Sequence, residues 1–137
     1  VKDAEALFER AGSAAIVKPD SPSSSLNTEI TNLKSLIETE YGLDVDVYDS
    51  GNIDCDSHVQ LGGKLLFLVG DRDNNNAIKC VPWFQETDPA GSTYDASFSI
   101  DRNVWGGGEY TFILSGSDLT LAVGHVSEAI FRPGQAH

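Results

Sequence analysis

The run Lys64-Leu65-Leu66-Phe67-Leu68-Val69 limits the fold to a few architectures, because its apolar residues do not alternate with polar ones. An alternating strand has one wet face, whereas a strand without polar positions is covered on both faces. Gly62-Gly63 precede the run and Gly70 follows it, and six residues between glycines favour a strand over a buried helix. We therefore predict a central strand in a sheet that has helices on both sides.

The rest of the chain completes an α/β pattern. Apolar spacing predicts helices over Asp3–Ala11, Ser25–Tyr41 and Leu119–Phe131, and a short helix from the asparagines Asn74–Asn76 to about Val81. Ser24 or Ser25 is expected to cap the second helix, and Gly42 to end it. Further strands are predicted over Ala14–Val17, Leu43–Tyr48, Tyr94–Ile100 and Glu109–Leu114. Irregular connections are expected over Asp49–Leu61, Pro82–Thr93 and Asp101–Gly108.

The order of these helices and strands along the chain predicts a single three-layer α/β domain over residues 1–137. Strands linked by helices form right-handed parallel crossovers. The last two strands are joined by a segment too short for a helix, so we expect them to form an antiparallel hairpin at one side. The predicted sheet is therefore mixed and mostly parallel, with about five strands flanked by helices.

The chain carries a formal net charge of −12, which excludes some partners. Nucleic acids and anionic membranes would repel such a surface. No apolar run approaches the roughly 20 residues that span a bilayer, so we expect no transmembrane segment. The sequence has no methionine and begins with Val1, so the initiator has been removed, as secretory processing or trimming would do.

Cys55 and Cys80 are the two cysteines of the chain. A matched pair of cysteines in an acidic domain of this size is most simply a disulfide. One alternative is two unrelated buried thiols. The other is a zinc site, which would need four ligands and for which Cys55-x-x-His58, Cys80 and His125 are the candidates. The disulfide and the acidic composition together predict a secreted or cell-surface location.

The sequence Asp71-x-Asp73-x-Asn75 has the first three oxygen ligands of a calcium loop. An EF-hand also needs glycine and glutamate where Asn76 and Pro82 stand, so that motif is excluded. A looser calcium site is the only cofactor site that we expect. The alternative is a solvated turn that caps a helix.

The aromatic residues Trp83, Phe84 and Trp105 lie in or beside predicted loops. Such side chains can stack on sugars or bury in a partner subunit, and the alternative is that they cover the domain's own core. Ser115-Gly116-Ser117 is not a nucleophile elbow, and the chain has no complete phosphate-binding loop. We therefore predict no enzymatic activity and no catalytic residue.

Several stretches carry a resemblance to known families, chiefly Ala15-Ile16-Val17-x-Pro19, Tyr41-Gly42-Leu43, Leu66–Gly70 and Glu109–Asp118 before a helix. They resemble the non-catalytic amino-terminal α/β domains of α-glucuronidases and β-hexosaminidases, and α/β modules of archaeal S-layer and cell-surface proteins. The resemblance implies an extracytoplasmic domain without chemistry of its own.

These inferences predict a secreted or cell-surface structural module that self-assembles into a surface layer or a filament. Its partners would be copies of itself or other cell-envelope proteins. The alternative function is a carbohydrate-binding accessory domain of a glycoside-hydrolase system, with glycans as partners of Trp83 or Trp105.

Overall fold

The computed structural model describes residues 12–71, 73–81, 97–107, 109–115 and 118–131. Its strands are β1 (Ser13–Lys18), β2 (Asp44–Asp49), β3 (Leu65–Val69), β4 (Ser97–Arg102) and β5 (Tyr110–Ser115). They form one sheet in the order β2-β1-β3-β5-β4. β2, β1, β3 and β5 run parallel, and β4 pairs antiparallel with β5 at the edge. A parallel sheet flanked by helices confirms the predicted α/β class.

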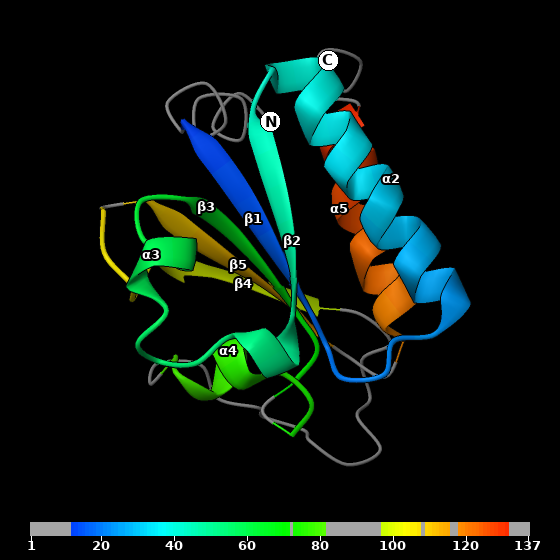
Figure 1. Cartoon of the computed structure of the whole chain (residues 1–137). Helices are drawn as coiled ribbons and strands as arrows, with labels where there is room; N and C mark the ends of the chain where they lie inside the picture. Colours follow the sequence, from blue (N-terminus) through cyan, green and yellow to red (C-terminus); the bar gives the residue numbers. More distant parts are fainter. Residues whose placement is uncertain (1–11, 72, 82–96, 108, 116–117, 132–137) are drawn as a thin grey trace.

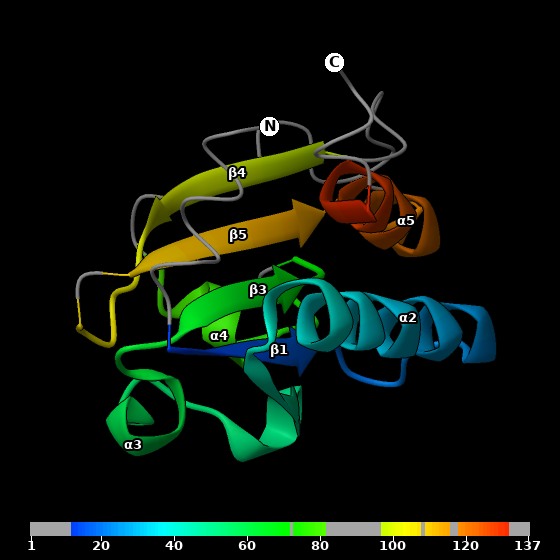
Figure 2. The same ribbon diagram turned by 90° about the horizontal axis from the view of Figure 1, so that it is seen from above.

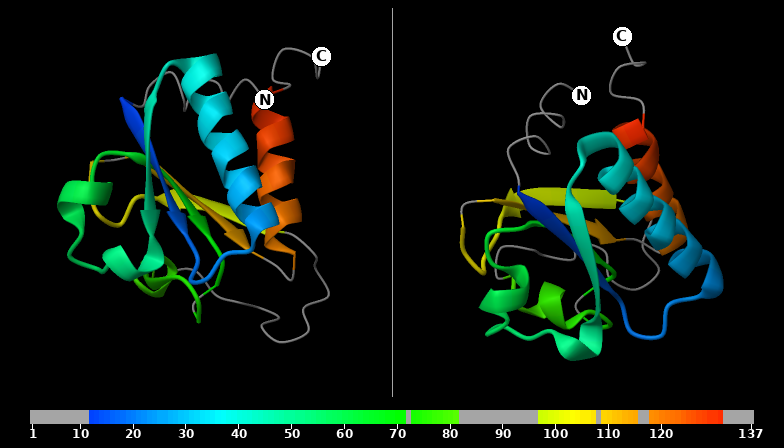
Figure 3. Two further views of the ribbon diagram at one scale, coloured as in Figure 1. Left: turned by 45° about the vertical axis from the view of Figure 1, so that its right-hand side comes forward. Right: turned by 45° about the horizontal axis from the view of Figure 1, so that its top comes forward.

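Helices cover both faces of this sheet (Figures 1 and 2). α2 (Ser24–Tyr41) and α5 (Leu119–Phe131) lie side by side on one face, as Figure 3 also shows. The short helices α3 (His58–Leu61) and α4 (Asn76–Lys79) lie on the other face. β3 occupies the middle, and all of its side chains are buried, as the unbroken apolar run predicts.

Side chains from alternate strand positions fill two cores. The core under α2 and α5 contains Ile16 of β1 and Phe67 of β3, and the Phe67 ring stacks on Phe112 with centroids 5.0 Å apart. The core on the other face contains Ala15, Leu66 and Leu68 together with residues of α3, α4 and Trp105. Because neighbouring residues of a strand point to opposite faces, one continuous apolar run supplies both cores.

α2 forms because apolar residues recur at spacings of three and four along it. Its buried positions are Leu26, Ile30, Leu33 and Ile37. Gly42 ends the helix in the left-handed conformation at φ 68°, as predicted. The prediction that Ser24 or Ser25 caps the helix is wrong. Ser23 is the cap, because its extended backbone lets its hydroxyl accept a hydrogen bond from the Leu26 N–H at 3.1 Å.

Two stretches that were predicted to be irregular contain regular secondary structure. The stretch Asp49–Leu61 contains a 3-10 turn, η1 (Ser50–Asn52), and then α3. It folds this way because Ile53 and Leu61 are buried in the second core, and the polar residues around them conceal that anchoring in the sequence. β4 extends to Arg102, past the predicted start of a loop at Asp101.

Other predicted elements agree with the structure within one or two residues, or lie outside the described residues. β2 is shifted by one residue from the prediction, and β3 begins at Leu65. The predicted helix Asp3–Ala11 and the predicted loop Pro82–Thr93 fall outside the described part. Within the described residues, no helix combines the length and apolar character that crossing a bilayer requires.

Cys55 and Cys80 form a disulfide, as predicted, with their Cα atoms 5.4 Å apart. The bond joins the segment between η1 and α3 to the residue that ends α4. Both sulfurs are used by this bond, so the alternatives of free thiols and of a zinc site are wrong.

Candidate functional site

The carboxyl ends of β1 and β3 frame the candidate site. After β1 the chain passes to β2 on one side, whereas after β3 it passes to the strands on the other side. Open α/β sheets bind ligands at such a reversal of strand order. A cleft of about 330 Å³ lies at this end of the sheet. Its lining residues are Pro19, Asp20, Ser21, Pro22, Ser23, Leu26, Asn74, Asp118, Leu119 and Thr120.

Several polar groups of the cleft hold backbone segments in place. Ser23 Oγ caps α2, and Asp118 Oδ1 accepts a hydrogen bond from the Leu121 N–H of α5 at 3.0 Å. The Asn74 carbonyl accepts a hydrogen bond from the Asp20 N–H at 2.7 Å, which joins the two loops. Asp20 and Asp118 are exposed and carry negative charge, so the cleft suits a neutral or cationic ligand better than a phosphate.

Gly70 allows the loop after β3 to turn sharply against the loop after β1. Its φ of +128° lies in a region that side-chain-bearing residues rarely adopt, and its N–H donates to the Leu114 carbonyl at 2.9 Å. A Cβ at this position would overlap Asn74 Oδ1 and would lie 3.1 Å from Pro19 Cβ. Asn74 Oδ1 in turn accepts a hydrogen bond from the Asp71 N–H at 2.8 Å.

We expect Gly70→Ala to lower the free energy of unfolding by about 2 kcal/mol, because it adds backbone strain and displaces Asn74. Urea unfolding monitored by circular dichroism measures the change. Gly51→Ala is the matched control, because a Cβ there would meet no atom within 4 Å. Equal stability of the two variants would contradict the close approach of these loops.

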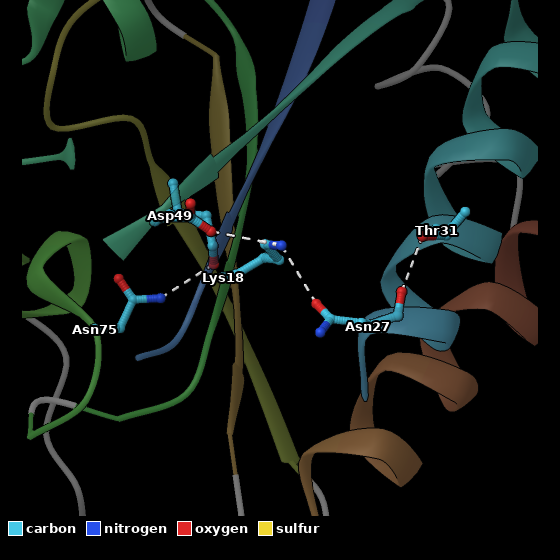
Figure 4. Close-up of polar contacts among 6 residues, drawn as sticks. Lys18, Asn27, Thr31, Asp49 and Asn75 are labelled. Atoms are coloured by element: carbon cyan, nitrogen blue, oxygen red, sulfur yellow. Dashed lines mark hydrogen bonds and ion pairs between the residues drawn. The ribbon is translucent and has the colours of Figure 1, made fainter. Parts of the chain in front are cut away.

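Asn75 fastens this end of the sheet from beneath. Its side chain is fully buried, and Nδ2 donates to the carbonyls of Val17 at 3.1 Å and of Val69 at 2.8 Å. Oδ1 accepts a hydrogen bond from the Ala77 N–H at 2.9 Å and so caps α4. One carboxamide therefore joins β1, β3 and α4, although the segments are far apart in the chain. Figure 4 shows Asn75 directed at the end of β1.

Lys18 joins the end of β1 to elements that neighbour it on the α2 side. Its Nζ donates to Asn27 Oδ1 of α2 at 3.3 Å and lies 3.5 Å from Asp49 Oδ1 of β2. In Figure 4, the Lys18 side chain points toward α2, and Asn75 approaches β1 from the other direction. The end of β1 is thus held on both sides by polar contacts.

Two of the residues predicted to bind calcium, Asp71 and Asn75, use their side-chain oxygens for hydrogen bonds to the backbone. Asp71 Oδ1 accepts hydrogen bonds from the backbone N–H groups of Asp73 at 2.9 Å and Asn74 at 3.1 Å. Asn75 is occupied by the buried bonds described above. In the described part of the chain, no three His, Cys, Asp or Glu side chains gather as metal ligands. Calcium binding by Asp71, Asp73 and Asn75 stays a prediction, and it would require Asn75 to give up its cap.

Trp105 belongs to the second core, as the alternative that it covers the domain's own core predicts, so its predicted contact with a ligand or partner is wrong. Its exposed fraction is 3%, and its indole Nε1 donates to the Asp54 carbonyl at 3.1 Å. Asn103 holds the loop by accepting from the Trp105 N–H at 2.7 Å and donating to the carbonyls of Leu61 and Lys64. The indole is therefore not available to stack on a sugar. Trp83 and Phe84 lie outside the described residues.

Sequence reasoning missed the role of Asn103, and assigned Asn75 only to capping and calcium. Asn103 fastens the amino end of β3 as Asn75 fastens its carboxyl end. Both side chains are buried, and both donate from one amide nitrogen to two carbonyls. Their local sequences give no signal for this role, because the accepting carbonyls come from distant segments.

The two histidines considered as zinc ligands lie apart from the cleft-lining residues. His58 Nδ1 is 3.0 Å from the Trp105 carbonyl, so that nitrogen carries the proton and donates. His125 is exposed on α5. Neither the contact of His58 nor the exposed position of His125 indicates a catalytic base.

Lys64 forms an ion pair with Asp46 and a cation–π contact with Tyr48, both of β2. Its Nζ lies 2.9 Å from Asp46 Oδ2 and 5.6 Å from the centre of the Tyr48 ring. β1 lies between β2 and β3, and its Ala15 pairs with Asp46 on one side and with Leu66 on the other, so Lys64 reaches across β1 to Asp46. Burial by itself would lower the pKa of the Lys64 ammonium, but the hydrogen bond and charge of Asp46 and the contact with Tyr48 raise that pKa above 10.5.

A raised pKa means that the charged form of Lys64 is favoured by folding. Its contribution is present below pH 10.5 and is lost as the pH rises through the folded-state pKa. We expect Lys64→Met to lower the free energy of unfolding by about 1 kcal/mol or less at pH 8, since Asp46 is largely exposed. The difference from the wild type should shrink at pH 11, and urea unfolding at both pH values measures it. A difference that grows with pH would contradict this assignment.

The sequence of this chain matches no protein-family model and none of the curated proteins. The resemblance to surface-layer modules and to glycosidase accessory domains therefore stays a prediction.

Proposed function

We propose that the chain is a non-catalytic, extracytoplasmic structural module that assembles with copies of itself or with other cell-envelope proteins. The observation that carries the proposal is the use of polar groups around the switch-point cleft. Ser23, Asn74 and Asp118 hold helix ends and loops, and Asn75 fastens the strands beneath them. These side chains stabilise a scaffold, which is what a structural module requires.

The disulfide supports an extracytoplasmic location. Disulfides persist in oxidising compartments and are rare where thioredoxin and glutathione keep thiols reduced. The Cys55–Cys80 bond also fixes the segment before α3 against the end of α4, the helix that Asn75 caps at its start. It therefore stiffens the helix that Asn75 joins to β1 and β3.

The net charge of −12 sets the conditions for assembly. Copies of the chain repel one another at low ionic strength, and the repulsion falls as salt shortens the screening length to a few ångström. Divalent cations can also bridge acidic surfaces. We therefore propose that assembly depends on calcium or on high salt.

Sedimentation velocity of the wild-type protein tests the proposal. We expect a 14.7 kDa monomer in dilute low-salt buffer and larger, concentration-dependent species in calcium chloride or in molar sodium chloride. A sodium chloride series matched to the ionic strength of the calcium samples separates screening from calcium bridging. A single monomeric species in all conditions would sink the proposal.

A second candidate function is carbohydrate binding, and the cleft is the observation that favours it. Its lining combines carboxylates and hydroxyls with proline and leucine side chains, which suits the polar and apolar faces of a sugar. Calorimetric titration with a glycan panel, using the wild type and Asp20→Asn, tests this function. Binding that the substitution weakens supports the cleft, and no heat with any glycan removes the candidate.

A further inference from the structure

The two cysteines of the Cys55–Cys80 bond lie in different surroundings. Cys55 is exposed, whereas Cys80 is half-buried and packs against the second core. Cys80 also ends α4, and the buried residue Val81 follows it. A thiolate opens a disulfide by attacking one of its two sulfurs, so access decides which sulfur is attacked. A thiol in solution therefore reaches this bond more easily at Cys55 than at Cys80.

The surroundings of Cys80 suit the sulfur that is released by such an attack. Cys80 Sγ lies 3.3 Å from the carbonyl oxygen of Asn76, one turn earlier in the chain. A disulfide sulfur has no proton to donate, but a Cys80 thiol can donate its S–H to this carbonyl. Opening the bond at Cys55 therefore releases a sulfur that already has a hydrogen-bond acceptor beside it.

The turn that carries Cys55 has further attachments, which do not involve its sulfur. The Asp54 carbonyl accepts a hydrogen bond from Trp105 Nε1 at 3.1 Å. Asp54 Oδ1 accepts from the Asp56 N–H at 2.8 Å, and Ser57 Oγ accepts from the Asp54 N–H at 3.0 Å. These hydrogen bonds hold the turn in place whether the disulfide is closed or open.

α4 is also attached to the fold without the disulfide. The Asn76 N–H donates to Ser50 Oγ at 2.9 Å, and Asn76 Nδ2 donates to the Ser50 carbonyl at 3.1 Å. Asn75 joins the start of the same helix to β1 and β3. Opening the bond therefore frees the end of α4 at Cys80, while the start of the helix stays fastened to the sheet.

The charges beside Cys55 favour some thiols over others. Asp54 and Asp56 flank Cys55 in the sequence, and both are exposed. Lys79, which precedes Cys80, is exposed as well, but the chain as a whole has a net charge of −12. An anionic thiol is therefore repelled at Cys55, whereas a cationic thiol is attracted, and salt weakens both effects.

We infer that Cys55 is a site of thiol–disulfide exchange in the folded chain, with a cationic thiol as the favoured substrate. The incoming thiol loses its proton to solvent, and its sulfur forms a bond to Cys55 Sγ as the Cys55–Cys80 bond breaks. Cys80 leaves as a thiolate, takes up a proton from solvent and donates a hydrogen bond to the Asn76 carbonyl. One disulfide replaces another, so the step needs no oxidant. Exchange at Cys55 requires neither self-assembly nor carbohydrate binding.

Treatment of the folded wild type with cysteamine, a cationic thiol, tests which sulfur is attacked. The reaction is quenched in acid after short times, and tandem mass spectrometry locates the mixed disulfide. We expect about ten times more adduct on Cys55 than on Cys80, and this excess should largely disappear in denaturing urea, where the fold no longer shields Cys80. Comparable adducts on both cysteines of the folded chain, or an excess unchanged in urea, would overturn the assignment.

The charge preference is tested by comparing cysteamine with thioglycolate, an anionic thiol. The ratio of their exchange rates should fall by about threefold or more between low salt and molar sodium chloride, and comparing each ratio with itself removes the difference in intrinsic reactivity. Asp56→Asn should lower the low-salt ratio in the same direction. A ratio that neither salt nor this substitution changes would overturn the preference for a cationic thiol.

Circular dichroism tests whether the fold survives opening of the bond. The double variant Cys55→Ser with Cys80→Ser stands for the open form, and its far-ultraviolet spectrum at 25 °C should match that of the wild type. A spectrum of an unfolded chain would contradict exchange in the folded state.

Discussion

Asn75→Ala is expected to lower the free energy of unfolding by about 4 kcal/mol, the largest single-residue effect that we predict. The substitution removes two buried hydrogen bonds, to the carbonyls of Val17 and Val69, and the cap on the Ala77 N–H. Each buried group left without a partner costs roughly 1–3 kcal/mol, and a lost cap about 1 kcal/mol. The ends of β1 and β3 would lose their common attachment to α4.

Urea unfolding monitored by circular dichroism measures this effect, and two variants control it. Asn27→Ala also replaces an asparagine by alanine, but the Asn27 side chain accepts one hydrogen bond, from Lys18 Nζ at 3.3 Å. This substitution should lower the free energy of unfolding by about 0.5 kcal/mol or less. Asn75→Asp keeps an oxygen for the cap but loses the amide donor, and it should be no more stable than Asn75→Ala. A loss below 1 kcal/mol in Asn75→Ala would show that this carboxamide does not hold the sheet.

Reduction of the Cys55–Cys80 bond is expected to lower the free energy of unfolding by about 3 kcal/mol, because an unfolded chain without the cross-link gains entropy. For a domain of this size, that loss corresponds to a fall in melting temperature of roughly 10 °C. Cys80 ends α4, which Asn75 caps at its other end, so reduction also loosens this helix.

Differential scanning calorimetry with and without reductant measures the shift. The double variant Cys55→Ser with Cys80→Ser is the control, because its melting temperature should be low and unaffected by reductant. Non-reducing mass analysis of the wild type should show two hydrogens fewer than the reduced chain. Two free thiols in protein isolated without reductant would contradict the bond and would remove its support for an extracytoplasmic location.

The sequence correctly predicted several features that depend on local residue patterns or on composition. The burial of β3 follows from its unbroken apolar run, and the extent of α2 follows from its spacing and from Gly42. The last helix has the predicted bounds, Leu119–Phe131. The disulfide follows from a matched pair of cysteines in an acidic chain. Each of these features depends on residues that are close in sequence or on the count of a single residue type.

The sequence did not predict features that depend on distant partners. Asn75 donates to a carbonyl 58 positions earlier, and Asn103 to one 42 positions earlier. The burial of Trp105 depends on Asp54 and on the second core, whereas the sequence around it predicted only an irregular connection. The cleft combines loops after three parallel strands, and their meeting depends on the strand order.

Electron microscopy of the wild-type protein tests the central claim, self-assembly of a structural module, most directly. Samples are prepared at high concentration in low salt, in molar sodium chloride and in calcium chloride. We predict filaments or layers in molar sodium chloride, in calcium chloride or in both, and dispersed single particles in low salt. Dispersed single particles in all three samples, at concentrations where sedimentation also shows only the 14.7 kDa chain, would contradict the account.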